Sequence, residues 1–253
     1  MALVFLDLDG TTLDGGKIAP GVLDAIELLR KNKHIVAIAT GRSPVLINGN
    51  DKIFNVDYLV LSNGGYVTHN GEVIYSNLIP KETVKELMDL ADELEFDMGL
   101  EYYDRYVAYR KKTAIVDYFS EAFNIEKPIE DHSFRPDEDV FGMIVYRDDH
   151  IELLKKRFPN LQFSRSIEKG YDINNKGDLK ADGVRALVKY LNYPKSEVYA
   201  IGDGTNDITM LRTVEHGIAM GNAYDSVKAE AEYVTTNVDD YGVYNALKHY
   251  NLI

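Results

Sequence analysis

Residues 3–12 read LVFLDLDGTT. The four apolar residues at the start, Leu3–Leu6, are too few for a helix and predict a buried strand of a parallel sheet. Asp7 and Asp9 follow at the carboxyl end of that strand, where side chains two positions apart point the same way, and Gly10 lets the backbone turn. Open α/β sheets bind ligands at the carboxyl ends of their strands, so this edge is the predicted site.

Two carboxylates held this close repel each other and lose hydration. The repulsion between Asp7 and Asp9 is relieved by a hard divalent cation, or by a proton that one of the two keeps. The plainer alternative is a strand end with two solvated acids, which is the commoner outcome for an arbitrary Asp-x-Asp. Three companion motifs further along the chain favour a functional pair of carboxylates over two solvated acids.

The composition excludes several classes of protein. The chain has 253 residues, a formal net charge of -13 and no cysteine. The negative charge argues against nucleic acid or an anionic membrane as the partner, because both require a positive surface. Without cysteine there is no disulfide framework and no zinc-cysteine site. The sequence also has no membrane-spanning apolar run and no signal peptide, so we expect a cytoplasmic protein.

The next strand supplies the second motif. Residues 34–39 (HIVAIA) are again a short apolar run, and Thr40, Gly41 and Arg42 follow it. A helix between the two strands makes a βαβ unit, so Thr40 is predicted at the same sheet edge as Asp7. In the alternative interpretation, Thr40 only caps backbone amides at a strand-to-helix junction.

The middle of the chain loses this alternation of strands and helices. A third strand at 58–61 and a hairpin around Asn70-Gly71 are followed by a helix at 80–94, a helix near 113–123 and a strand at 141–146. Helices and paired strands without βαβ order predict a second, α+β domain inserted into the first. The predicted domains are a first core part at 1–79, the inserted domain at 80–178 and a second core part at 179–253.

The last third returns to the opening order. Lys180 lies in the first turn of a predicted helix, where the helix dipole favours negative charge, so an anionic neighbour would offset the mismatch. The alternative is an ordinary solvated lysine. A strand at 198–201 then leads into residues 202–207, GDGTND. The acids and the amide of this loop indicate a bound cation more than a nucleotide held by bare backbone amides.

Taken together, these motifs resemble those of a known family. DLDGT at 7–11, TGR at 40–42, the lysine at 180 and GDGTND at 202–207 are similar to the four motifs of the haloacid dehalogenase superfamily of phosphohydrolases, and within it of the Cof-type members. The resemblance covers essentially the whole chain. It implies an α/β fold, with a Rossmann-like, three-layer parallel-sheet core and an inserted α+β cap domain that looks like the C2B variety.

The resemblance also implies a role for each matching residue. Asp7 would be the nucleophile and Asp9 the general acid and base. The substrate-binding residues would be Thr40, Gly41, Arg42, Lys180 and Asn206, with Thr40 and Lys180 also counted as catalytic. The metal ligands would be Asp7, the main-chain carbonyl of Asp9, and Asp203. Asp207 would lie just outside the metal ligands or steady Lys180.

The implied activity is hydrolysis of small phosphorylated metabolites, such as sugar phosphates, through an aspartyl phosphate. Magnesium suits the site better than zinc, because the proposed donors are all oxygen atoms and the chain has no cysteine. Lys176, in the same stretch NNKGDLKADG, is a rival to Lys180 as the phosphate-binding lysine. We expect a monomer or a weak homodimer.

Other functions are open alternatives. A receiver-like signalling domain also accepts phosphate on an aspartate, but an acid at position 9 favours turnover. A phosphosugar mutase on the same scaffold would differ in its product, and a catalytically idle binding protein would not need every position of the chemistry filled. Four tyrosines of the cap strands either face a sugar or simply pack: Tyr102, Tyr103, Tyr106 and Tyr109.

Overall fold

The strand β1 (Leu3–Leu6) lies inside an eight-stranded sheet, and its four side chains are fully buried. It pairs in parallel on both sides, with β14 (Val198–Gly202) and with β4 (Ile35–Ala39). An all-apolar strand suits this position, because a central strand of a parallel sheet is covered on both faces. The opening motif therefore begins with a buried strand of a parallel sheet, as predicted.

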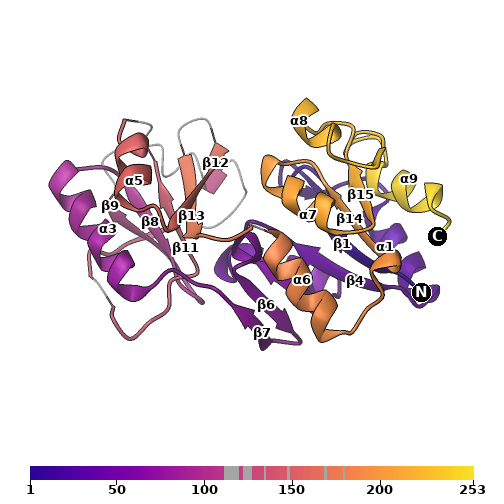
Figure 1. Cartoon of the computed structure of the whole chain (residues 1–253), viewed down its shortest axis with the longest axis horizontal. Coiled ribbons are helices and arrows are strands. Elements are labelled where there is room, and N and C mark those ends of the chain that lie inside the picture. The colour runs from indigo at the N-terminus through magenta and orange to yellow at the C-terminus, as the bar shows by residue number, and fades with distance from the viewer. Residues whose placement is uncertain (111–119, 122–126, 134, 147–148, 168–169, 179) are drawn as a thin grey trace. The chain divides into compact units, whose positions relative to one another are not determined.

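The structure is a computed structural model, and it describes the chain except for residues 111–119, 122–126, 134, 147–148, 168–169 and 179 (Figure 1). Contacts divide it into two units, which are described separately. The first unit comprises Met1–Gly41, Gly49–Ser76 and Asp178–Ile253. The second unit comprises Arg42–Asn48 and Asn77–Gly177.

The sheet of the first unit is parallel over six strands and ends in an antiparallel hairpin. Its order is β16 (Tyr233–Val234), β15 (His216–Ala219), β14, β1, β4, β5 (Tyr58–Leu61), β6 (Tyr66–His69) and β7 (Glu72–Ser76). The β6–β7 turn contains Asn70 and Gly71, both at positive φ, as the Asn-Gly hairpin signal predicts. The predicted loop at 13–19 contains a small hairpin of β2 (Leu13–Asp14) and β3 (Lys17–Ile18).

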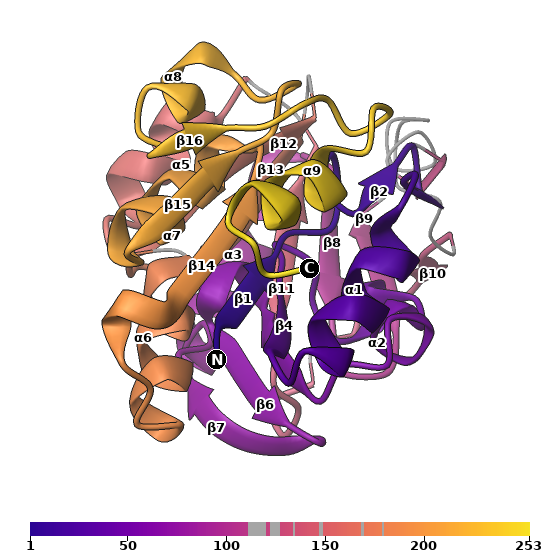
Figure 2. The same ribbon diagram turned by 90° about the vertical axis from the view of Figure 1, so that its right-hand side faces the viewer.

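Helices cover both faces of this sheet (Figure 2). α1 (Val22–Lys31) and α9 (Gly242–His249) contact each other on one face. α6 (Lys180–Tyr190) and α7 (Ile208–Thr213) pack together on the other, where their apolar residues join the core formed by β1 and β4. Two short helices, α2 (Asn50–Ile53) and α8 (Asp225–Lys228), complete the described helices of this unit. The first unit is thus a three-layer, Rossmann-like α/β core, as predicted.

The second unit is built on a mixed six-stranded sheet with helices on one face (Figure 1). Its order is β10 (Ile129–Glu130), β9 (Tyr106–Arg110), β8 (Met98–Glu101), β11 (Gly142–Val145), β13 (Gly170–Asn175) and β12 (Leu161–Ile167). α3 (Lys81–Leu94) and α5 (Ile151–Arg157) supply apolar side chains to the core on that face. The helix predicted near 113–123 falls almost entirely outside the described residues.

The second unit also takes in Arg42–Asn48, a segment that the predicted domains assign to the core. This segment contains a 3-10 turn, Val45–Ile47. The predicted domain limits at residues 80 and 178 stay a prediction. Within the described part of the chain, no helix has the length and apolar character needed to span a membrane.

Two of the four cap tyrosines pack in the helix-side core. Tyr102 and Tyr109 belong to the cluster of buried residues between the sheet and its helices. Tyr106 is buried on the opposite face of the sheet, and Tyr103 is exposed. Packing thus accounts for Tyr102 and Tyr109.

His34 accepts a hydrogen bond from the residue that precedes β1. The amide of Ala2 donates to His34 Nδ1 at 2.7 Å, so this nitrogen must be unprotonated. Burial and the nearby amino terminus lower the pKa of His34, although the carbonyl of Leu252 opposes the shift. A histidine whose pKa is lower in the folded state stabilises the fold above its unfolded pKa of about 6.5, and loses that contribution as the pH falls below it.

We therefore expect the melting temperature to fall between pH 7.5 and pH 5.5 by more in the wild type than in His34→Asn, in which an amide oxygen can accept from Ala2 at either pH. Thermal unfolding followed by circular dichroism measures the difference. His132→Asn, at an exposed histidine of the second unit, is the control and should retain the wild-type pH dependence. An equal fall in wild type and His34→Asn would contradict the assignment.

Candidate active site

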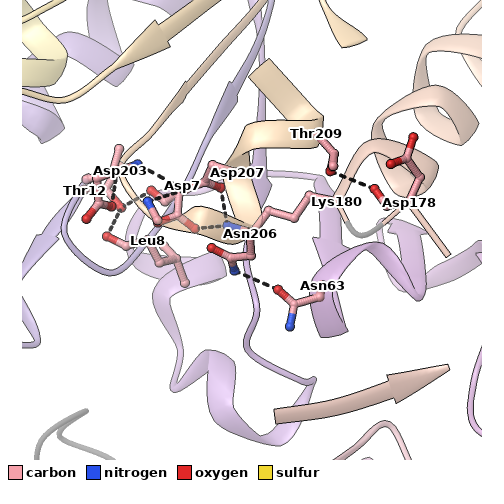
Figure 3. Close-up of polar contacts among 12 residues, drawn as sticks. Asp7, Leu8, Thr12, Asn63, Asp178, Lys180, Asp203, Asn206, Asp207 and Thr209 are labelled. Atoms are coloured by element: carbon pink, nitrogen blue, oxygen red, sulfur yellow. Dashed lines mark hydrogen bonds and ion pairs between the residues drawn. The ribbon is translucent and has the colours of Figure 1, made fainter. Parts of the chain in front are cut away.

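β1 brings Asp7 to the carboxyl edge of the sheet. The amide of Asp7 donates to the carbonyl of Ile201 at 3.0 Å, which extends the pairing with β14 by one residue. Thr12 Oγ1 donates to the carbonyl of Asp7 at 2.8 Å, so the turn after the strand folds back on its own start (Figure 3). The Asp7 side chain is buried and fixed in direction by its neighbours.

Lys180 lies between two of the acids. Its Nζ donates to Asp7 Oδ1 and, at 2.6 Å, to Asp207 Oδ1 (Figure 3). The Lys180 side chain is only 1% exposed. Its place at the first residue of α6 opposes the helix dipole, and the two carboxylates supply the anionic neighbours that the sequence led us to expect.

Asp207 shapes the loop after β14. Its Oδ2 accepts hydrogen bonds from the amides of Asp203, at 3.0 Å, and Gly204, at 2.9 Å. Its Oδ1 is the acceptor for Lys180. With both oxygens engaged, Asp207 is suited to steady Lys180 and the loop, and poorly suited to bind a ligand.

Asp203 approaches the opening motif from the neighbouring strand end. Thr11 Oγ1 donates to Asp203 Oδ1 at 3.0 Å. Gly10 has φ of 80°, and a Cβ there would lie 2.2 Å from Asp203 Oδ2. Glycine is needed at this position both for the left-handed backbone and for the space that the carboxylate occupies.

The described residues bring three carboxylates to one point, those of Asp7, Asp203 and Asp207, each offering an oxygen within 4.8 Å of the others. The Lys180 ammonium balances one of the three charges, which leaves two negative charges at the cluster when all three acids are ionised. A divalent cation with oxygen ligands matches that excess. Among the described residues, Asp207 is held by Lys180 and by two main-chain amides, whereas Asp7 and Asp203 accept only from side chains, so Asp7 and Asp203 are the carboxylates that fit a metal.

Burial and the neighbouring charges shift the pKa values of these groups. Burial, followed by the charge of Asp207, raises the pKa of Asp7 well above its usual value, although Lys180 opposes the rise. Burial and Asp207 raise the pKa of Asp203 to about 7. Burial alone would lower the pKa of Lys180, but Asp207 and Asp7 outweigh it and raise that pKa. Lys180 is therefore charged, and the acids need a further cation or a proton.

The second motif and the fourth meet through a residue that the sequence motifs did not single out. Thr40 is buried at the end of β4, and its carbonyl accepts from the amide of Asn63 at 3.1 Å. Asn63 Oδ1 in turn accepts from Asn206 Nδ2 at 2.8 Å (Figure 3). Gly41 lies against the same amide, since a Cβ there would be 3.1 Å from Asn63 Oδ1. Asn63 thus orients Asn206 beside the Thr40–Gly41 turn.

Asn222 is a second such residue. Its Nδ2 donates to the carbonyl of Gly10 at 2.9 Å, and its Oδ1 accepts from the amide of Val238 at 2.8 Å. Asn63 and Asn222 each follow shortly after a strand of the sheet, β5 and β15 respectively. The sequence signal that could have identified both residues is a polar side chain soon after a parallel strand, because the carboxyl ends of these strands share one edge of the sheet.

The remaining predicted residues lie outside the carboxylate cluster. The half-buried side chain of Asp9 is not one of the three clustered carboxylates, and only its main-chain carbonyl was predicted as a ligand. Arg42 belongs to the second unit, where its Nη1 donates to the carbonyl of Leu46 at 3.1 Å. Lys176 is also in the second unit, and its Nζ donates to the carbonyl of Pro159 at 3.0 Å. Of the two rival lysines, Lys180 is the one that contacts Asp7.

Comparison with known proteins agrees with this geometry. The family model described as haloacid dehalogenase-like hydrolase matches residues 4–247. The putative phosphatase YkrA of Bacillus subtilis is 30% identical over 252 residues, covering 99% of this chain and 98% of that protein.

Solved structures agree as well. The phosphatase BT1666 of Bacteroides thetaiotaomicron has a TM-score of 0.89 at 29% identity, covering 100% of this chain and 96% of that one. The subclass IIB sugar phosphatase BT4131 has a TM-score of 0.88 at 27% identity and covers 100% of both chains. The chain therefore belongs to the haloacid dehalogenase-like hydrolases, and within them to the Cof-type phosphatases.

Proposed function

We propose that the chain is a Mg²⁺-dependent phosphomonoesterase that hydrolyses small phosphorylated metabolites, such as sugar phosphates, through an aspartyl phosphate on Asp7. The observation that carries the proposal is the Lys180 ammonium buried between Asp7 and Asp207 at the carboxyl edge of the sheet. The similarity to a sugar phosphatase supports the substrate class. Cytoplasmic location and a monomer or weak homodimer stay predictions.

In the proposed reaction, Asp7 and Asp9 have different tasks. A carboxylate oxygen of Asp7 forms a bond to phosphorus as the bond to the leaving oxygen breaks, and Asp9 gives its proton to that oxygen. Water then attacks phosphorus, its proton passes to Asp9, and the carboxylate of Asp7 is released with inorganic phosphate. Asp9 serves both steps and returns to its starting state.

The metal would be held by the carboxylates of Asp7 and Asp203 and by the main-chain carbonyl of Asp9. When bound, Mg²⁺ supplies positive charge that offsets the repulsion between an anionic nucleophile and an anionic substrate. Thr11 holds the Asp203 carboxylate by a hydrogen bond, and Asn222 holds the carbonyl of Gly10 in the turn after Asp9.

The phosphate oxygens would be held by groups from three motifs. Thr40 and Lys180 supply a hydroxyl and an ammonium, and Asn206 supplies an amide oriented by Asn63. Gly41 and Arg42 continue the turn that begins at Thr40. Phosphoryl transfer depends mainly on such positioning and on neutralisation of the equatorial oxygens.

Removal of divalent cations is expected to abolish the activity. When Asp7, Asp203 and Asp207 are all ionised, Lys180 leaves two of their negative charges unbalanced, so a substrate phosphate meets repulsion without a cation. A panel of phosphorylated metabolites, assayed by phosphate release before and after EDTA, measures this, with added Mg²⁺ restoring the rate. Full activity after exhaustive chelation would exclude the metal from the mechanism.

Lys180→Met should lower kcat by at least about 100-fold, because it removes a charge aimed at the transferring group. Lys176→Met is the matched control, at a lysine of the second unit whose Nζ donates to the main-chain carbonyl of Pro159. Steady-state kinetics of both variants, with circular dichroism to check folding, decides between them. A damaged Lys176→Met with a mild Lys180→Met would reverse the choice of lysine.

Asp9→Asn is expected to have a defect that depends on the leaving group. The variant keeps its main-chain carbonyl but has no proton to donate, and general acid catalysis is worth about 10²- to 10⁴-fold. An alkoxide from a sugar needs that proton, whereas nitrophenolate needs little of it. Rapid-quench measurement of phosphorylation with both esters should show the larger loss on the alkyl phosphate.

Asp7→Asn is the control for that experiment and should be inactive with both esters, because it lacks the nucleophile. Equal losses on the two esters in Asp9→Asn would mean that Asp9 is not the acid.

A further inference from the structure

The second unit buries a carboxyl group on the face of its sheet opposite to α3 and α5. Glu101, at the end of β8, is 5% exposed. Its neighbours across the sheet are Tyr106 of β9 and Gly142 of β11. A Cβ at Gly142 would lie 2.6 Å from Glu101 Oε2, so the absence of a side chain there makes room for the carboxyl group.

The segment Arg42–Asn48 packs on this same face. Leu46, with Val45 beside it, forms a small core with Tyr106, Ala108, Ile144 and Tyr146. The amides of Leu46 and Ile47 both donate to the carbonyl of Ser43, at 3.0 and 3.1 Å, so the segment is a closed turn that begins at Ser43.

Ser43 and Glu101 meet under this turn. The Ser43 side chain is fully buried, and among the described residues its Oγ makes no hydrogen bond of normal geometry. It lies close enough to Glu101 to lower the pKa of that carboxyl group. Burial and the charge of Asp172 have the larger, opposite effect and raise the pKa of Glu101 to about 8. Glu101 is thus mostly protonated at pH 7.

The turn is joined directly to the phosphate-binding motif. Ser43 follows Thr40 by three residues, and Thr40 and Gly41 are fixed in the first unit by their contacts with Asn63. Three residues of chain reach at most about 11 Å. Only Gly41 and Arg42 separate Ser43 from Thr40, so loss of the packing at Ser43 frees the chain directly after the contacts that fix Thr40 and Gly41.

We propose that Glu101 is a positioning residue for the turn Thr40–Arg42: its buried carboxyl group, next to Ser43, keeps the segment Arg42–Asn48 packed on β8, β9 and β11. This inference rests on the proposed function, in which Thr40 holds the substrate phosphate. Ionised Glu101 would be a buried charge without a cation, and the segment must then separate from the sheet to let water in.

Apart from the Ser43 hydroxyl, which lowers the pKa of Glu101, the groups that face Glu101 do not favour its ionised form. Asp172 of β13 is an acid, and burial raises the pKa of the Tyr106 phenol well above its usual value, so that phenol stays neutral. In the segment itself, the Arg42 guanidinium donates to the carbonyl of Leu46. Among the described residues, no ion pair with Glu101 is formed.

The first test is the pH dependence of kcat/KM in wild type and Glu101→Gln. At pH 9, one unit above a pKa of about 8, roughly one tenth of Glu101 keeps its proton, so the wild type should lose about tenfold relative to pH 7. Glu101→Gln, which stays neutral, should keep its rate. Glu152→Gln, at an exposed acid of α5, should follow the wild type. An alkaline loss of equal size in Glu101→Gln overturns the proposal.

Two further variants should shift the fall of kcat/KM at high pH, here called the alkaline limb of the profile, in opposite directions. Ser43→Ala removes a group that lowers the pKa of Glu101, so the limb should shift to higher pH. Asp172→Asn removes a negative charge that raises this pKa, so the limb should shift to lower pH. A residue that merely contributed to folding would change the height of the profile and leave the limb in place, and that result also contradicts the proposal.

Hydrogen exchange tests the packing without any assay of activity. The amides of Leu46 and Ile47, corrected for intrinsic exchange, should open more readily at pH 9 than at pH 7 in the wild type and equally at both in Glu101→Gln. Equal protection at both pH values in the wild type overturns the proposal. Its failure is distinct from failure of the proposed function, which would show as a wild type that hydrolyses no phosphate ester while the exchange difference persists.

Discussion

The buried ammonium group of Lys180 holds the site together. It joins the carboxylate that follows β1 to the one that follows β14, and it comes from the first residue of α6, so three separate elements meet at one cation. Removing one partner of a buried ion pair typically costs about 3–5 kcal/mol, because the other charge is left uncompensated. Each of these elements is therefore held in the position that brings Asp7 to the sheet edge, and the direction of the Asp7 side chain is a property of the whole core.

The same cation accounts for the close packing of the acids. Glycine is required wherever a carboxylate presses against the backbone: Gly10 beside Asp203, and Gly202, where a Cβ would lie 2.5 Å from the carboxyl carbon of Asp207. Lys180 balances only one of the three charges that this packing collects. The sheet edge thus collects more negative charge than Lys180 balances, and burial together with the charge of Asp207 raises the pKa of Asp7.

Much of this arrangement could be predicted from the sequence, because parallel strands place their carboxyl ends together. The buried strand before Asp7 and the anionic neighbours of Lys180 followed from local pattern, and the three-layer core followed from the resemblance of the motifs to a known family. The partners of Asn63 and Asn222 could not be predicted, since loop geometry decides which side chains meet. Glu101 was also out of reach, because its burial depends on a missing side chain at Gly142 and on a distant turn at Ser43.

The central claim is that Asp7, held in place by Lys180, is the nucleophile that attacks phosphorus. Borohydride reduction of an acid-quenched single turnover converts an aspartyl phosphate to homoserine, and peptide mass spectrometry then locates it. The account predicts homoserine at position 7 in the wild type and at no other aspartate. Homoserine at position 9 or 203, or its absence in a reaction that nevertheless releases phosphate, would contradict the account.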